Sequence, residues 1–170
     1  MQLPGLAALL ALAALSLTGG PGHARESPAP LDMRGVAEQA AIELKARHYD
    51  AAAAAYQRII DRYPDSLFAW DNLGMVRYDQ GETNAAIGAF KHAIHLDPKD
   101  DLAQMSLGVC LYEKREYSAA IPPFERAEKL RADNSNVHAF LAQCYAKVGR
   151  EDDAHREMQI ENVQQLDTYR

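Results

Sequence analysis

The chain repeats one pattern of apolar and polar positions every 34 residues. Written from Met33, it forms four lines without a gap: 33–66, 67–100, 101–134 and 135–168. Alanine stands at the twentieth place of every line, and the eighth place always holds glycine or alanine. Within the lines, apolar residues recur at spacings of three and four, which is the period of a helix with one buried face. The pattern therefore predicts four structural repeats of one kind.

Polar residues that start helices recur with the same period. Asp, Asn and Ser side chains accept hydrogen bonds from the free N–H groups at the start of a helix. These residues precede each first apolar stretch and recur in the middle of each repeat: Asp32, Ser66, Asp100 and Asn134, then Asp50, Asn84, Ser118 and Asp152. Each repeat is therefore predicted to contain two helices of about 13 residues, joined by a tight turn.

Small and large residues alternate between the two helices of each repeat. Gly or Ala at places 8 and 20 lets the paired backbones approach closely, and large residues at places 7 and 24 are expected to fill the space beside that contact. Pro122 and Pro123 fall about one turn inside the second helix of the third repeat, where proline removes a backbone donor. We expect a small bend or a shortened first turn there, in an unbroken repeat.

The second repeat carries a recognisable set of residues. They stand at its places 4, 7, 8, 15, 20, 24, 27 and 32: Trp70, Leu73, Gly74, Gly81, Ala86, Phe90, Ala93 and Pro98. This set resembles the tetratricopeptide repeat. The third and fourth repeats match it in part, and the first is the weakest, with Gln39 where leucine is usual. The resemblance implies an all-α fold, an α-solenoid of four helix-turn-helix repeats in a right-handed superhelical array.

The resemblance also implies a binding surface. In this family, places 2, 5, 9 and 12 of the first helices line a concave groove that holds partner proteins. Carried onto this chain, the partner-binding groove consists of nine residues: Phe68, Asp71, Met75, Tyr78, Leu102, Met105, Val109, Tyr112 and Gln143. Aromatic and methionine side chains are common anchors for a docked helix or an extended peptide. The alternative is that some of them pack against a neighbouring helix instead.

The N-terminal segment differs from the repeats. No charged side chain precedes Arg25, and Leu6–Leu17 is a continuous apolar run, too short for the roughly 18 residues that span a bilayer. The run has the length of a signal-peptide core, and small residues precede a cut after Ala24. We predict a cleavable signal peptide over 1–24 and a short lead-in over 25–32. An uncleaved anchor and a plain apolar helix are the alternatives.

The net charge, the cysteines and the histidines exclude or disfavour some classes of function. The formal net charge is −6, whereas a nucleic-acid binder carries a basic face. Cys110 and Cys144 stand one repeat apart, so their Cα atoms should lie about 8–10 Å from each other, too far for a disulfide. We interpret both as buried thiols. His92 and His95 have the spacing of two metal ligands on a helix, but a solvated helix face is the favoured interpretation.

The resulting prediction is an exported adaptor, periplasmic or secreted, that holds a peptide or helix of a partner protein in a bacterial envelope assembly. The alternative is a scaffold that associates with itself. No phosphate-binding loop, nucleophile elbow or paired-cysteine metal motif occurs in the sequence. We therefore predict no enzymatic activity, cofactor, bound metal or small-molecule substrate. A metal-dependent activity at His92 and His95 is the third and least favoured hypothesis.

Overall fold

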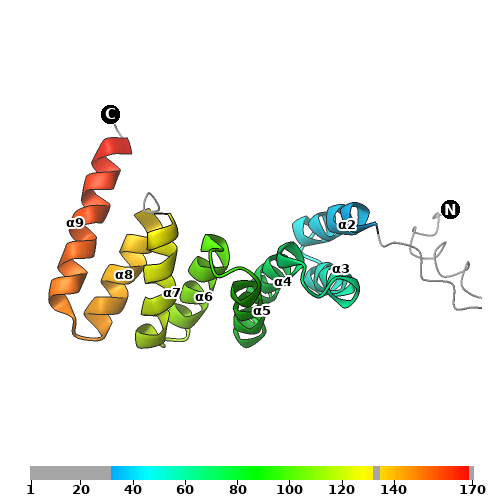
Figure 1. Cartoon of the computed structure of the whole chain (residues 1–170), viewed down its shortest axis with the longest axis horizontal. Coiled ribbons are helices and arrows are strands. Elements are labelled where there is room, and N and C mark those ends of the chain that lie inside the picture. The colour runs from blue at the N-terminus through cyan, green and yellow to red at the C-terminus, as the bar shows by residue number, and fades with distance from the viewer. Residues whose placement is uncertain (1–31, 132–134, 169–170) are drawn as a thin grey trace, which may run out of the picture. The chain divides into compact units, whose positions relative to one another are not determined.

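A computed structural model describes the backbone of residues 32–131 and 135–168 and the side chains of residues 32–131 and 136–160. This part of the chain contains helices and no strand: α2 (Met33–Lys45), α3 (Tyr49–Arg62), α4 (Leu67–Asp79), α5 (Thr83–Leu96), α6 (Asp101–Glu113), α7 (Tyr117–Leu130), α8 (Ser135–Lys147) and α9 (Glu151–Thr168). Each helix packs against the next one along the chain (Figure 1). Helix α6 also contacts both α4 and α8. The predicted all-α repeat array is confirmed.

The first helix of each repeat begins where the sequence predicts. The side chains of Asp32, Ser66 and Asp100 each accept a hydrogen bond from the backbone N–H three residues ahead. They therefore satisfy one of the free donors at the start of α2, α4 and α6. The fourth predicted cap, Asn134, lies outside the described residues.

The second helices begin earlier than predicted. Asp50, Asn84, Ser118 and Asp152 were expected to cap them, but these residues lie inside the first turn of α3, α5, α7 and α9. The caps of α3, α5 and α7 are instead His48, Glu82 and Glu116, whose side chains form no cap hydrogen bond. The turn before each second helix explains the earlier start. The second helix begins two residues after the left-handed residue of that turn.

A left-handed residue ends each first helix at place 15 of the repeat. Gly81 and Gly149 have φ of 78°, and Arg47 and Arg115 have φ of 59° and 61°. The next N–H donates back to a carbonyl five residues earlier, as Glu82 N does to Arg77 O at 2.9 Å. This is the hydrogen bond of a Schellman motif, which favours glycine at the left-handed position. This left-handed conformation is strained for the two arginines, which have a Cβ atom, and is unstrained for glycine.

Glycine at place 8 receives the aromatic ring of place 24 in the same repeat. A Cβ atom added to Gly74 would lie 2.6 Å from the ring of Phe90, and one added to Gly108 would lie 2.6 Å from the ring of Phe124. Both rings are fully buried. The large side chain therefore lies directly on the small residue, which is a closer fit than the predicted packing beside it.

The buried residues form two apolar clusters that meet at Trp70. One cluster joins repeat one to α4, and the other extends from α5 to α9. Trp70 packs against both, and its indole N–H donates to the carbonyl of Pro64 at 2.7 Å. None of the described helices combines the length and the apolarity of a membrane-spanning helix.

The two prolines leave α7 intact. This helix spans Tyr117–Leu130 and begins at the same place of the repeat as α3 and α5. The first turn is therefore not shortened, contrary to one of the two expectations. Pro123 is buried against the core, so the ring takes part in packing even though it removes a helical hydrogen bond.

Candidate functional site

Four of the nine predicted groove residues line one cavity between α4 and α6. Met75 and Tyr78 come from α4, and Met105 and Val109 come from α6. The cavity has a volume of about 230 Å³, and its lining also includes the buried side chains of Phe90 and Cys110, together with the polar residues Asp79 and Ser106. The stacking of repeats two and three thus produces a mainly apolar hollow.

Exposed apolar side chains continue the surface beside this cavity. Phe68 is 49% exposed, Leu102 48% and Met75 42%. Phe68 precedes Met75 by seven residues and Leu102 precedes Val109 by seven, so each pair lies on one face of its helix, two turns apart. Two adjacent helices therefore present apolar side chains on the faces that line the cavity. We call these six residues of α4 and α6 the groove: Phe68, Met75, Tyr78, Leu102, Met105 and Val109.

In the second and third repeats, the tyrosine at place 12 connects the first helix to the first helix of the next repeat. The hydroxyl of Tyr78 donates to the carboxylate of Glu113 on α6. That hydrogen bond, together with burial, raises the pKa of Tyr78 to about 12. One repeat further on, the hydroxyl of Tyr112 donates to Oε1 of Gln143 on α8 at 2.6 Å. Tyr112 and Gln143, both predicted groove residues, are therefore in direct contact. Their hydrogen bond connects α6 to α8.

Asp71 differs from the other predicted groove residues because it is buried. It is 8% exposed, and its Oδ1 atom has no hydrogen-bond partner. Burial, followed by the hydrogen bond with Asp100 and its charge, raises the pKa of Asp71 to about 7. Asp100 caps α6, so the start of the next repeat covers place 5 of α4. Asp71 therefore presents no open charge to a partner.

The two cysteines and His92 behave as packing residues, whereas His95 is exposed, as expected for a solvated helix face. Cys110 and Cys144 are free and buried, as predicted, and burial raises the pKa of each thiol to about 11. The ring of His92 packs against Trp70 in a tilted arrangement, with 4.0 Å between the ring centroids, whereas the ring centroids of His92 and His95 are 6.4 Å apart. His92 is therefore half-buried against the indole, which differs from the predicted solvated face.

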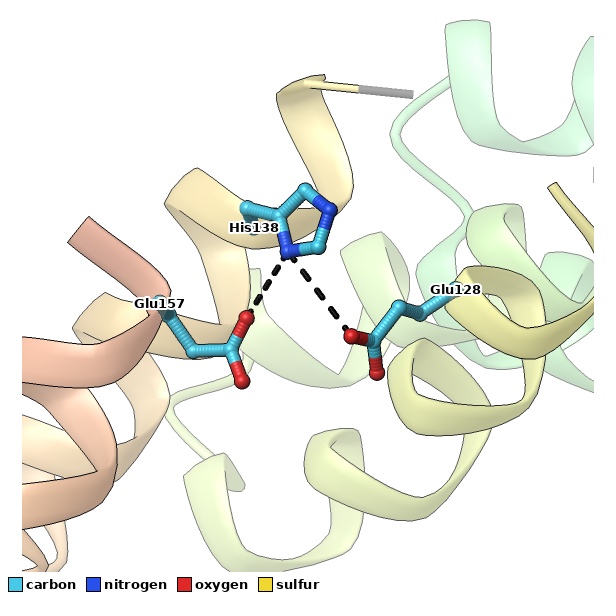
Figure 2. A group of neighbouring side chains, drawn as sticks. All are labelled: Glu128, His138 and Glu157. Carbon is cyan, nitrogen blue, oxygen red and sulfur yellow. Dashed lines mark hydrogen bonds and ion pairs between the residues drawn. The ribbon is translucent and has the colours of Figure 1, made fainter. Parts of the chain in front are cut away.

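A cluster that the sequence analysis missed lies where α7, α8 and α9 meet. Nδ1 of His138 lies 2.8 Å from Oε2 of Glu157 and 3.9 Å from Oε1 of Glu128 (Figure 2). The His138 and Glu157 side chains are buried, and that of Glu128 is 27% exposed. Burial, and then the charge of Glu157, raises the pKa of Glu128, while His138 acts in the opposite direction.

The cluster was invisible to an analysis of single helices because each residue comes from a different one. Within the described side chains, these three form the one group of three or more His, Cys, Asp or Glu residues that could hold a metal ion, and the atoms involved lie within 4.8 Å of one another. A signal existed in the repeat alignment. His138 stands at place 4, which Trp70 holds in the second repeat, whereas Glu128 and Glu157 stand at places 28 and 23, which were not among the compared columns.

Solved structures of MamA share this fold. A crystal structure of MamA superimposes with a TM-score of 0.77 at 18% identity, over 83% of this chain and 82% of that chain. Another crystal structure of MamA gives 0.75 at 22% identity, over 79% and 73%. The MamA RS-1 ArsTM double mutant gives 0.75 at 14% identity, over 81% and 77%. At these identities the likeness concerns the fold.

The sequence itself matches a family. Curated proteins give no significant match to the chain. The tetratricopeptide repeat profile, however, matches residues 37–91 and 72–137, which together cover more than half of the sequence. This match agrees with the helix pairs, the glycine–phenylalanine contacts and the caps described above. The chain belongs to the tetratricopeptide repeat family, whose members are scaffolds for protein–protein interaction.

Proposed function

We propose that this chain is an exported adaptor that holds a peptide or helix of a partner protein in its groove, as part of a bacterial envelope assembly. The observation that carries the proposal is the apolar cavity between α4 and α6, with exposed Phe68 and Leu102 on the same helix faces. Exposed side chains of this kind, next to a cavity that receives an anchor, are typical of surfaces that bind peptides.

The charges beside the groove indicate the chemistry of the partner segment. Asp79 lines the cavity, and Glu113 holds the hydroxyl of Tyr78 at its edge. The chain as a whole carries a formal charge of −6. A segment with apolar anchors and adjacent Lys or Arg side chains therefore complements this surface better than an acidic one.

Site-specific photo-crosslinking in the native organism tests the proposal. A photo-reactive amino acid replaces Met75 or Met105 in the full chain, and the matched control carries it at Gly88 on α5. Gly88 suits this purpose because it is exposed, and an added Cβ would meet nothing within 4 Å. The groove positions should crosslink to one defined segment of a partner, identified by mass spectrometry, and the control should not.

The same experiment separates the alternatives. Crosslinks from Met75 and Met105 to a second copy of this chain would favour the self-associating scaffold. Equal crosslinking from the groove and from Gly88 would contradict a specific surface. As a further control, the charge-introducing Met75→Lys variant should weaken crosslinking from Met105 without changing helicity measured by circular dichroism.

Export has a separate test. The prediction rests on the apolar segment 6–17 and the small residues before Arg25, all outside the described residues. Mass spectrometry of the protein isolated from its native organism should find a chain that begins near Arg25, in the fraction outside the cytoplasm. A cytoplasmic protein that retains residues 1–24 would contradict export while leaving the groove proposal intact.

A further inference from the structure

At each junction between two consecutive repeats, three equivalent positions lie on the helices that meet there. At the last junction all three hold residue types that differ from those at the earlier junctions. The three positions are place 28 of one repeat and places 4 and 23 of the next. At the first junction they hold Ile60, Trp70 and Ala89, and at the second Ile94, Gln104 and Pro123. At the third junction they hold Glu128, His138 and Glu157. Among the six residues of the first two junctions, Gln104 is the one polar side chain. All three residues of the third junction are of types that bind metal ions.

We propose that Glu128, His138 and Glu157 form a binding site for one divalent transition-metal ion, with Zn²⁺ as the best-fitting ion, which links α7, α8 and α9. The donor set is one imidazole nitrogen and two carboxylate oxygens, and both kinds of ligand occur in zinc sites. Figure 2 shows the two carboxylates approaching the same ring nitrogen from different helices.

The distances fit an ion after small side-chain movements. With ligand bonds of about 2.0–2.2 Å, tetrahedral zinc places neighbouring donor atoms roughly 3.4 Å apart. The two distances from His138 Nδ1, 2.8 and 3.9 Å, lie on either side of that value. All three donor atoms lie within 4.8 Å of one another, so shifts of about 1 Å would close the coordination sphere. The side chain of Glu128 is 27% exposed, so an ion can reach the cluster from the side of α7.

The charge balance also favours a divalent cation. Two carboxylates beside a neutral imidazole carry a charge of −2, which a divalent ion cancels. A protonated His138 in the absence of metal cancels only one of the two. Because His138 and Glu157 are buried, a remaining unpaired charge is expensive there.

The position of the cluster gives the ion a structural role. Ala154 and Glu157 are the buried residues among the described side chains of α9, and Met158 and Ile160 are 41% and 39% exposed. This part of α9 therefore has little apolar contact with the array. An ion that joins α9 to α7 and α8 would supply the stability that the earlier repeats obtain by packing.

Zinc titration of the full, untagged chain tests the proposal. After treatment with a chelator, the protein competes with a coloured zinc indicator, and elemental analysis gives the stoichiometry. We expect one zinc ion per chain. At a hundredfold excess of zinc over the Kd, the melting temperature should rise by about 5–10 °C. Co²⁺ should give the visible absorption bands of a tetrahedral site.

Two variants identify the ligands. His138→Gln introduces the residue that the third repeat carries at this place, and it should weaken zinc binding at least about 100-fold. The triple variant Glu128→Ile, His138→Trp, Glu157→Ala copies the first junction, so it should fold and bind no zinc even if the single variant folds poorly. The control His92→Gln, His95→Gln should keep one zinc ion per chain.

The opposite results are equally clear. If the full chain takes up no zinc, the cluster is an ion pair and the proposal is wrong. If the triple variant keeps the stoichiometry, the shift in melting temperature and the Co²⁺ bands, the ion binds elsewhere and the proposal is also wrong. Neither outcome bears on the groove, which lies on other residues.

Discussion

Repeat two and the junction before repeat four are built from the same helix arrangement, yet they are held by different interactions. In repeat two, the ring of Phe90 lies directly on Gly74, and Trp70 joins two apolar clusters. In repeat four, the place of Trp70 is taken by His138, which contacts two carboxylates. The first region is held mainly by the fit of apolar side chains, and the second is held by charged side chains. One scaffold thus combines a region that carries the proposed groove with an end that is held by a charged cluster.

The largest loss of stability is expected when a large side chain is introduced into the tightly packed core of repeat two, which we call the shape-held region. In the Gly74→Leu variant, the new side chain meets the buried ring of Phe90, because even a Cβ atom would lie 2.6 Å from it. The free energy of unfolding should fall by roughly 3–4 kcal/mol. Urea denaturation followed by the fluorescence of Trp70, the single tryptophan, measures it. The control Gly88→Leu should cost little, and equal losses in both variants would contradict the packing account.

The cluster of Glu128, His138 and Glu157, which we call the charge-held region, should be destabilised when the imidazole of His138 is removed. In chelator-treated protein, His138→Ala leaves the Glu157 carboxylate buried without its 2.8 Å partner. The free energy of unfolding should fall by about 2–3 kcal/mol. Replacing all three cluster residues by Ile, Trp and Ala should instead leave stability unchanged or higher, since apolar groups need no partner. A triple variant less stable than His138→Ala would show that the charges themselves are required.

Asp71 is a buried acid within the shape-held region and should make it sensitive to pH. Its pKa of about 7 in the folded chain lies above the ordinary value of 3.8, so the folded chain binds the extra proton between these values. The stability that Asp71 contributes is therefore full below pH 4 and is lost as the pH rises through 7. Asp71→Asn should be more stable than the wild type by about 2 kcal/mol at pH 8, and the two should converge near pH 4. A constant difference across this range would contradict the raised pKa.

The smallest effect concerns the turns, which both regions share. Arg115 has a left-handed φ of 61°, at the place that glycine holds in repeats two and four. Arg115→Gly should raise the free energy of unfolding by roughly 0.5–1 kcal/mol, because the strain of the arginine outweighs the greater freedom of unfolded glycine. Thermal and urea unfolding measure the gain. Gly81→Ala, which introduces the strain at the matching turn, should show a loss of similar size.

The repeat architecture could be predicted because its determinants are local and periodic. Gly74 and Gly108 mark the close contacts, and Asp32, Ser66 and Asp100 cap the first helices as expected. The starts of the second helices were misplaced, because the left-handed turn residues decide them, and arginine at two of these turns carries no such signal.

The proposed groove and the charged cluster show how far the sequence alone can predict a site. Met75, Tyr78, Met105 and Val109 share a cavity because the repeat fixes which helix faces meet. Asp71 has an equivalent place in the pattern, but the cap of the next repeat covers it. The Glu128–His138–Glu157 cluster depends on three helices at once, so it emerges only when the places of different repeats are compared in space.

Amide hydrogen exchange on the chelator-treated wild type and the His138→Gln variant tests the difference between the two regions most directly. The account predicts faster exchange in α8 and α9 of the variant and unchanged protection in α4 and α5, because only the last junction depends on the charged cluster. Equal loss of protection along all helices, or no change in α8 and α9, would contradict it.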